Sequence, residues 1–232
     1  MAIKTYHSIG LMSGSSLDGL DIAFCKFKVE NDIVLNWELL KAETIPFSEM
    51  WYSRLAHLPT QSALVYAKTH VYFGHYMGEL VIDFMSRNNI LPDFISSHGH
   101  TVFHHPDKRM TAQIGDGGAL AATTGLMVVS DFRTQDIALG GEGTPLAPAA
   151  DKYLFNGYDF YLNIGGIANI SCNANGKMIA FDIGGANQVF NGLAYLADQD
   201  YDKGGKIAAN GAVVNELLRE VNSIDYFSKK YP

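Results

Sequence analysis

The chain has 232 residues, of which 47% are hydrophobic and 18% are charged. This composition supplies enough apolar side chains for a folded core and excludes a disordered, collagen-like or coiled-coil protein. The formal net charge of −7, together with the absence of a Lys/Arg cluster, argues against nucleic acid as a partner.

Three features of the sequence favour a cytoplasmic protein. Cys25 and Cys172 are too few for a disulfide framework and do not have the spacing of metal ligands. The first seven residues lack the apolar core of a signal peptide. The longest apolar-rich stretch, residues 64–85, is interrupted by charged and histidine side chains, so we expect no membrane span.

The first half of the chain predicts strands alternating with helices. Residues 6–12 form an apolar run, and residues 20–27 alternate with period two after a polar, glycine-bounded turn. We expect further strands at residues 33–42, 94–97, 112–114 and 126–130, and helices at residues 48–58, 61–87 and 118–124. This alternation is typical of an α/β protein.

A second, similar unit is predicted after a turn-rich seam at residues 140–148. A strand at residues 160–164 ends at Gly165-Gly166, and strands at residues 167–172 and 178–181 follow it. Each half therefore begins with a glycine-containing hairpin. Such a tip lets backbone N–H groups approach an anion closely, and two tips facing each other across a cleft would hold a triphosphate. The alternative is that these glycines only supply turn conformations.

Five segments resemble, in the same order, the motifs of the anhydro-N-acetylmuramic acid kinases, a family of the actin/hexokinase/Hsp70-like ATPase superfamily. The Ser97-His98-Gly99-His100-Thr101 segment is similar to the family's Ser-His-Gly-Gln-Thr. The other four are Ile9-Gly10-Leu11-Met12-Ser13-Gly14-Ser15-Ser16-Leu17-Asp18-Gly19-Leu20-Asp21, Asp131-Phe132-Arg133 with the run from Gly140 to Leu146, Leu162-Asn163-Ile164-Gly165-Gly166-Ile167-Ala168-Asn169, and Phe181-Asp182-Ile183-Gly184-Gly185-Ala186-Asn187.

The resemblance implies a two-lobed α/β fold of the actin-like ATPase (ribonuclease H-like) kind, with lobes at residues 1–146 and 147–232 and the second lobe incomplete. It also implies an ATP-dependent and Mg²⁺-dependent kinase that hydrolytically opens the 1,6-anhydro ring and phosphorylates O6 of the sugar. The partners would be ATP and a small sugar, with no nucleic acid and no membrane, and a homodimer is left open.

The resemblance also implies a role for individual residues. Asp182 would be the general base that activates water, Asp18 would lie near Mg²⁺ or its water shell, and Arg133 with His98 and Thr101 would face the sugar. ATP phosphates would bind the two hairpins, at Gly14, Ser15, Ser16, Leu17, Asp18, Gly19, Leu20, Asp21, Gly165 and Gly166.

Each assignment has a simpler alternative. Asp182 would cap the helix that begins near Asn187, Asp18 would be an ordinary turn residue, and Arg133 would pair with Asp136 on the surface. The histidines, among them His98, His100, His104 and His105, would hold metal for a hydrolytic reaction.

The sequence also departs from the family pattern. Residues 182–187 replace its Asp-Thr-Gly-Pro-Gly-Asn, and Asn191 stands where an Asp is usual. A non-catalytic or drifted nucleotide- or sugar-binding relative is therefore the alternative function.

Overall fold

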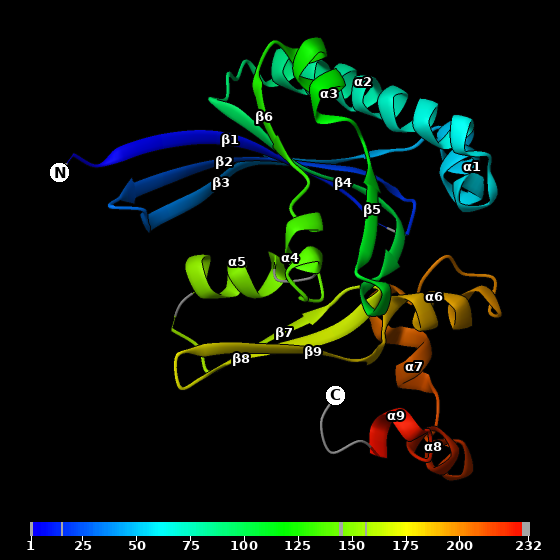
Figure 1. The fold of residues 1–232 in the computed structure, drawn as a ribbon. Helices are drawn as coiled ribbons and strands as arrows, with labels where there is room; N and C mark the ends of the chain where they lie inside the picture. Colours follow the sequence, from blue (N-terminus) through cyan, green and yellow to red (C-terminus); the bar gives the residue numbers. More distant parts are fainter. Residues whose placement is uncertain (1, 15, 144–145, 156, 229–232) are drawn as a thin grey trace. The chain divides into compact units, whose positions relative to one another are not determined.

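The computed structural model describes residues 2–14, 16–143, 146–155 and 157–228. It forms two compact units, Met1–Leu154 and Phe155–Pro232, and each contains a sheet with helices (Figure 1). The α/β class predicted from the sequence is confirmed. The two units part between Leu154 and Phe155 rather than after Leu146, because α5 (Leu146–Leu154) packs on β3 and the Leu154 carbonyl accepts a hydrogen bond from Trp37 Nε1 at 2.8 Å.

The first unit is built on a six-stranded sheet in the order β3-β2-β1-β4-β5, with β6 also paired to β4. Strands β1 and β4 run parallel, and β4 pairs with β6 in its first half and with β5 in its second. The strands are β1 (Lys4–Ser13), β2 (Gly19–Glu30), β3 (Ile33–Pro46), β4 (Phe94–His105), β5 (Met110–Ile114) and β6 (Met127–Ser130).

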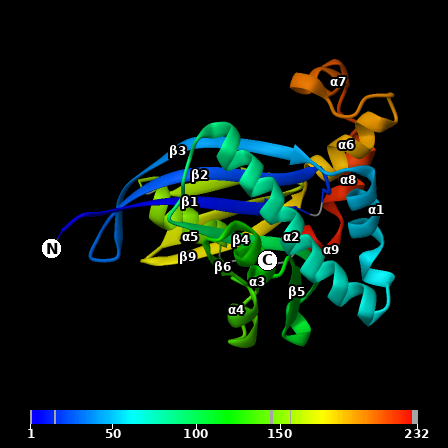
Figure 2. The same cartoon turned by 90° about the horizontal axis from the view of Figure 1, so that it is seen from above.

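Helices cover both faces of this sheet (Figure 1). The long helix α2 runs diagonally across the strands with α3 beside it, as Figure 2 shows from above. The helices of the first unit are α1 (Glu49–His57), α2 (Ala63–Asn88), α3 (Gly117–Thr124), α4 (Thr134–Ala138) and α5, with short 3₁₀ helices at Leu58–Thr60 and Pro106–Lys108. In the described ranges, no helix combines the length and apolar character needed to cross a membrane.

Helices α2 and α3 begin at polar caps, and α2 buries an apolar stripe. The hydroxyl of Ser62 accepts a hydrogen bond from the Val65 amide at the start of α2, and Asp116 caps α3 through the Ala119 amide at 2.6 Å. The stripe of α2 that includes Phe73, Met77, Val81 and Phe84 is fully buried against the alternating inward residues of the strands. This packing forms the core of the first unit.

Strand β4 is longer than predicted and carries a bulge in its middle. The predicted strand at residues 94–97 continues through the histidine-rich segment to His105, because residues from His100 onward pair with β5. Against β1, Leu11 lies opposite Ser97 but Ser13 lies opposite His100, so β4 holds one extra residue at this point. Gly99 makes the bulge with φ of +72°, and a Cβ there would lie 2.4 Å from the carbonyl oxygen of Ile114.

A buried polar pair joins β1 to β4 directly after the bulge. Ser13 Oγ and His100 Nδ1 lie 2.9 Å apart, and both residues are at most 4% exposed. Burial, and to a lesser degree the neighbouring His98, lowers the pKa of His100 from its ordinary 6.5 to about 4. The imidazole is therefore neutral at pH 7.

The second unit contains a three-stranded antiparallel sheet in the order β7-β8-β9, followed by short helices. A bulge at Ile183 separates two registers of the β8–β9 pair, since Ala168 faces Gly184 and Asn169 faces Asp182. The elements are β7 (Phe160–Ile164), β8 (Ile167–Ala174), β9 (Lys177–Gly185), α6 (Asn187–Tyr195), a 3₁₀ helix at Lys203–Gly205, α7 (Lys206–Asn210), α8 (Asn215–Asn222) and α9 (Asp225–Ser228).

Acid should destabilise the protein partly through His100. In the unfolded chain the imidazole of His100 takes up a proton near pH 6.5, whereas in the folded protein it does so only near pH 4. The free energy of unfolding therefore decreases as the pH drops from about 6.5 to about 4, by up to about 3 kcal/mol. Urea denaturation of the complete gene product at pH 7 and pH 4 should show a smaller loss in His100→Gln than in wild type. The exposed His57, replaced by Gln, serves as control. An identical loss in His100→Gln and wild type would contradict this assignment.

Replacing Gly99 should cost more than replacing another left-handed glycine. Gly99 and Gly125 have nearly the same φ, +72° and +71°, but nothing lies within 4 Å of a Cβ at Gly125. Gly125→Ala should cost about 1 kcal/mol from backbone strain, and Gly99→Ala about 1–3 kcal/mol more from the clash with Ile114. Chemical denaturation measures both variants. Equal losses would show that the contact with Ile114 relaxes without cost.

Candidate functional site

The tip of the β1–β2 hairpin is a turn closed by its own backbone. The Leu17 amide donates to the Gly14 carbonyl at 3.3 Å, and Leu17, not a glycine, is in the left-handed region with φ of 60°. The Ser16 hydroxyl donates to Asp18 Oδ1 at 2.8 Å. Ser15, which the sequence also assigned to this turn, lies outside the described residues.

This tip has free backbone donors. In the described part of the chain, the amides of Gly14, Ser16 and Asp18 have no hydrogen-bond acceptor. A Cβ on Gly14 would meet nothing closer than Ser16 Oγ at 3.3 Å, so the backbone at Gly14 is open to an approaching group. Clustered free N–H groups suit phosphate oxygens.

The remaining predicted phosphate residues lie in the sheet. Gly19 is buried, and a Cβ there would lie 2.4 Å from the carbonyl oxygen of Ile45. Leu20 is fully buried in the core, and Asp21 Oδ1 accepts a hydrogen bond from the Thr44 hydroxyl at 2.5 Å. Their side chains therefore serve strand pairing and packing, and the open part of the hairpin is limited to its tip.

Asp18 is suited to a magnesium ion bound through water. It is exposed at the tip, and one of its carboxylate oxygens has no partner in the described chain. Mg²⁺ prefers oxygen ligands and commonly keeps several waters when it binds one or two carboxylates and substrate phosphates.

Arg133 is buried and joins three segments of the first unit. Its guanidinium donates to the Gly143 carbonyl at 2.5 Å, to Thr101 Oγ1 at 3.1 Å and to the imidazole of His104 at 3.2 Å. Asp136 instead accepts a hydrogen bond from the Gly143 amide at 2.7 Å. The alternative surface pairing of Arg133 with Asp136 is therefore wrong. Thr144 and Pro145, which follow this loop, lie outside the described residues.

The structure brings Arg133, Thr101 and His98 near one another, and the sugar-facing role that the resemblance implies for them stays a prediction. Desolvation lowers the pKa of Arg133 and that of His98. The positive charge of Arg133 also lowers the pKa of His98, by a smaller amount. His98 Nδ1 contacts the Gly99 carbonyl at 3.1 Å. A neutral imidazole beside a buried cation is an arrangement that binds neutral or anionic oxygen ligands.

One residue that the sequence did not single out joins this cluster. Gln113 on β5 lies opposite Thr101 and donates to its hydroxyl at 3.3 Å. Elsewhere on β4, the hydroxyl of Ser97 is buried without a partner in the described chain. No local motif marks Gln113, because only the β4–β5 register brings it to Thr101.

His98, His100 and His104 of β4 are engaged with protein groups. His100 contacts Ser13 and His104 contacts Arg133, and within the described ranges no three His, Cys, Asp or Glu side chains gather as metal ligands would. The geometry gives the metal-dependent alternative no support.

The β7–β8 hairpin of the second unit holds the start of α6. The carbonyl of Gly166 accepts hydrogen bonds from the amides of Ala186 and Gln188, and the carbonyl of Gly165 accepts from Asn187. The amides of Gly165 and Gly166 have no acceptor in the described chain. This tip therefore presents free donors, as the first one does.

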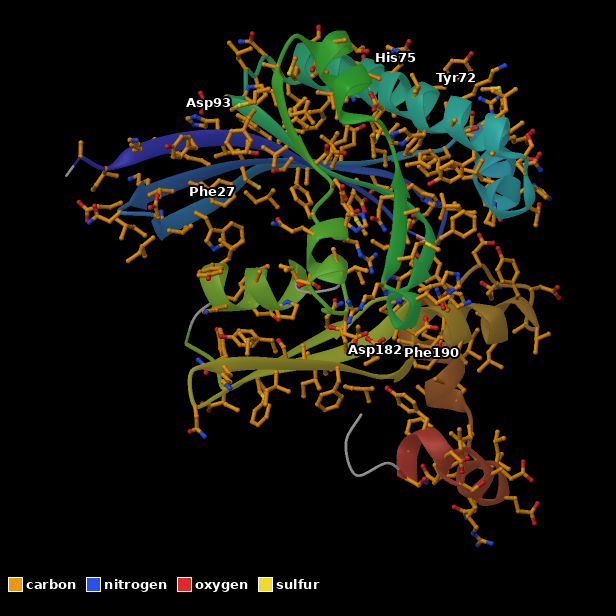
Figure 3. All side chains as sticks on the ribbon, in the orientation of Figure 1. Phe27, Tyr72, His75, Asp93, Asp182 and Phe190 are labelled. Atoms are coloured by element: carbon orange, nitrogen blue, oxygen red, sulfur yellow. The ribbon has the colours of Figure 1, made fainter. Side chains whose placement is uncertain are left out.

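Asp182 is exposed and lies on β9 opposite Asn169. Figure 3 labels it together with Phe190, which belongs to the following helix α6. Its main-chain carbonyl accepts a hydrogen bond from the Tyr226 hydroxyl. Because the hairpin carbonyls satisfy the first amides of α6, and α6 has no side-chain cap, the alternative in which Asp182 caps this helix is wrong. An exposed carboxylate at a strand end is available to act as a base.

The clearest hollows in the surface lie elsewhere. One of about 440 Å³ is lined by α1 and the start of α2, including Met50, Arg54 and Val65, and another of about 320 Å³ lies around Tyr201. None of the predicted site residues lines either one.

Comparison with known proteins identifies the family. The family model for anhydro-N-acetylmuramic acid kinase matches residues 6–232. The anhydro-N-acetylmuramic acid kinase of Aliivibrio fischeri is 37% identical over 97% of this chain and 63% of its own length, and that of Francisella tularensis subsp. novicida is 35% identical over 97% and 64%. The chain thus spans just under two thirds of the length of these curated relatives.

Among solved structures, the ethanolamine utilization protein EutJ from Carboxydothermus hydrogenoformans matches 94% of this chain and 66% of its own, with a TM-score of 0.37 and 14% identity. The family model and the curated relatives agree over nearly the whole sequence. The chain belongs to the anhydro-N-acetylmuramic acid kinase family.

Proposed function

We propose that the protein containing this chain is a cytoplasmic ATP-dependent kinase that opens the ring of 1,6-anhydro-N-acetylmuramic acid and phosphorylates O6, in the recycling of cell-wall sugars. The observation that carries this proposal is the family match over residues 6–232. The free amides at both hairpin tips, the exposed Asp182 and the buried Arg133 cluster are consistent with it.

In this proposal each group has one task. The Asp182 carboxylate takes a proton from water, whose oxygen bonds to the anomeric carbon while the bond from that carbon to O6 breaks. The freed O6 attacks the γ-phosphorus of ATP, and ADP leaves. The tip amides of Gly14, Ser16 and Asp18, and those of Gly165 and Gly166, bind phosphate oxygens. Arg133, Thr101 and His98 bind the sugar.

A magnesium ion near Asp18 would neutralise the phosphate charges when bound. Asp18 is the residue that would hold its water shell, because its carboxylate is exposed beside the tip amides.

Replacing Asp182 tests the base directly. In the complete gene product, Asp182→Asn should lower turnover about 100-fold or more while leaving ATP and sugar binding nearly unchanged, because only the proton acceptor is lost. Asp198→Asn is a matched control, since Asp198 has φ of 54°, which Asn tolerates equally. Steady-state kinetics and calorimetric binding measure both variants. Unchanged turnover in Asp182→Asn would reject the assignment, and sugar or ATP binding without turnover in wild type would favour the non-catalytic alternative.

Gly14 offers a test of the first hairpin that spares the fold. A side chain at Gly14 meets no backbone atom closer than 3.9 Å, so Gly14→Val should fold normally but obstruct the tip amides. We expect the KM for ATP to rise roughly tenfold or more and the KM for sugar to stay within about twofold. Gly192→Val, with nothing within 4 Å of its Cβ, is the control. Equal increases in both KM values would contradict phosphate binding at this tip.

A further inference from the structure

Gln113 links two threonines of the first unit through one amide group. Its Nε2 donates to Thr111 Oγ1 at 2.7 Å and to Thr101 Oγ1 at 3.3 Å. Its Oε1 is buried and has no hydrogen-bond partner in the described chain. The Gln113 amide thus donates both of its N–H groups to neighbouring hydroxyls, and its oxygen is left without a hydrogen bond.

The hydroxyl of Thr101 receives a second hydrogen bond, from Arg133 Nη1 at 3.1 Å. A hydroxyl has two acceptor lone pairs and one proton, and a guanidinium only donates. With both lone pairs engaged, the Thr101 proton is left to donate. No acceptor for it is present in the described ranges.

The direction of this network is set by Thr111. Its hydroxyl donates to the Phe103 carbonyl at 3.3 Å, so towards Gln113 it acts as an acceptor. Turning the Gln113 amide over would place its oxygen 2.7 Å from Thr111 Oγ1, and Thr111 would have to turn its proton away from the Phe103 carbonyl to donate to it. Arg133 is held by the Gly143 carbonyl and cannot reverse its role.

A role in stability alone does not account for Gln113. An unpaired buried acceptor is unfavourable for folding, and an apolar side chain would avoid it. What the hydrogen bonds of Gln113 provide instead is a fixed orientation of the Thr101 hydroxyl.

We propose that Gln113 is a positioning residue, which holds the Thr101 hydroxyl as a hydrogen-bond donor to an oxygen atom of the bound sugar. This inference rests on the proposed function, since it refines how the Arg133–Thr101 cluster recognises its substrate. The ligand group is a hydroxyl or carbonyl oxygen that accepts one hydrogen bond.

A double-mutant cycle in the complete gene product tests the proposal. Gln113→Met keeps the length of the side chain and removes the hydrogen bonds, and it should raise the KM for the anhydro sugar roughly tenfold, leaving the KM for ATP and kcat within about twofold. Thr101→Val should raise the sugar KM at least as much. The double variant should be no worse than Thr101→Val alone, because Gln113 acts through Thr101. Losses that multiply in the double variant would overturn the proposal.

Two further variants separate positioning from support of the fold. Gln113→Glu offers acceptors only, so it should attract the Thr101 proton and impair sugar binding more than Gln113→Met. If Gln113 only supported the fold, Gln113→Met would impair sugar binding more than Gln113→Glu, since Glu is the closer replacement for Gln. Gln135→Met, at an exposed glutamine of α4, should change neither KM, and melting temperatures of all variants identify any that unfold.

Calorimetric titration with the anhydro sugar distinguishes this inference from the proposed function. A wild type that binds the sugar, with unchanged affinity in Gln113→Met, overturns this inference alone. A wild type that neither binds nor phosphorylates the sugar overturns both.

Discussion

The bulge in β4 is the constraint on which the first unit depends. Gly99 brings β4 against the Ile114 carbonyl so closely that no side chain fits, and the extra residue shifts the register so that Ser13 meets His100. Gly115, with φ of +110°, lies on the other side of this contact under Phe73 and Met77 of α2. Helix α2 therefore supports the bulge, and the bulge places the next residues, His100 and Thr101, beside the β1–β2 hairpin and Arg133.

The electrostatics of the cluster follow from the same packing. A buried guanidinium is costly unless its donors are used, and Arg133 uses them on a carbonyl, a hydroxyl and an imidazole. Burial keeps His98 and His100 neutral at pH 7. The positive charge of Arg133 is thus not joined by charged histidines at its side, so the cluster offers a single cation to a ligand.

Local patterns predicted most of the fold and part of the site. Period-two runs predicted the strands, and the apolar spacing of residues 61–87 predicted α2 to within two residues at either end. These predictions succeed because both signals depend on near neighbours in the sequence. The extension of β4, the helices α4 and α5, and the burial of Gly19 and Leu20 were missed, because each depends on a partner strand or helix distant in the sequence. Gln113 was missed for the same reason.

The proposed function requires that O6 of the sugar, and not water, receives the phosphoryl group. The complete gene product incubated with ATP and 1,6-anhydro-N-acetylmuramic acid in water enriched in oxygen-18 tests it, with the products read by mass spectrometry. We predict a ring-opened sugar 6-phosphate whose phosphoryl group carries no oxygen-18. Inorganic phosphate labelled with oxygen-18 beside an unchanged anhydro sugar would contradict the claim.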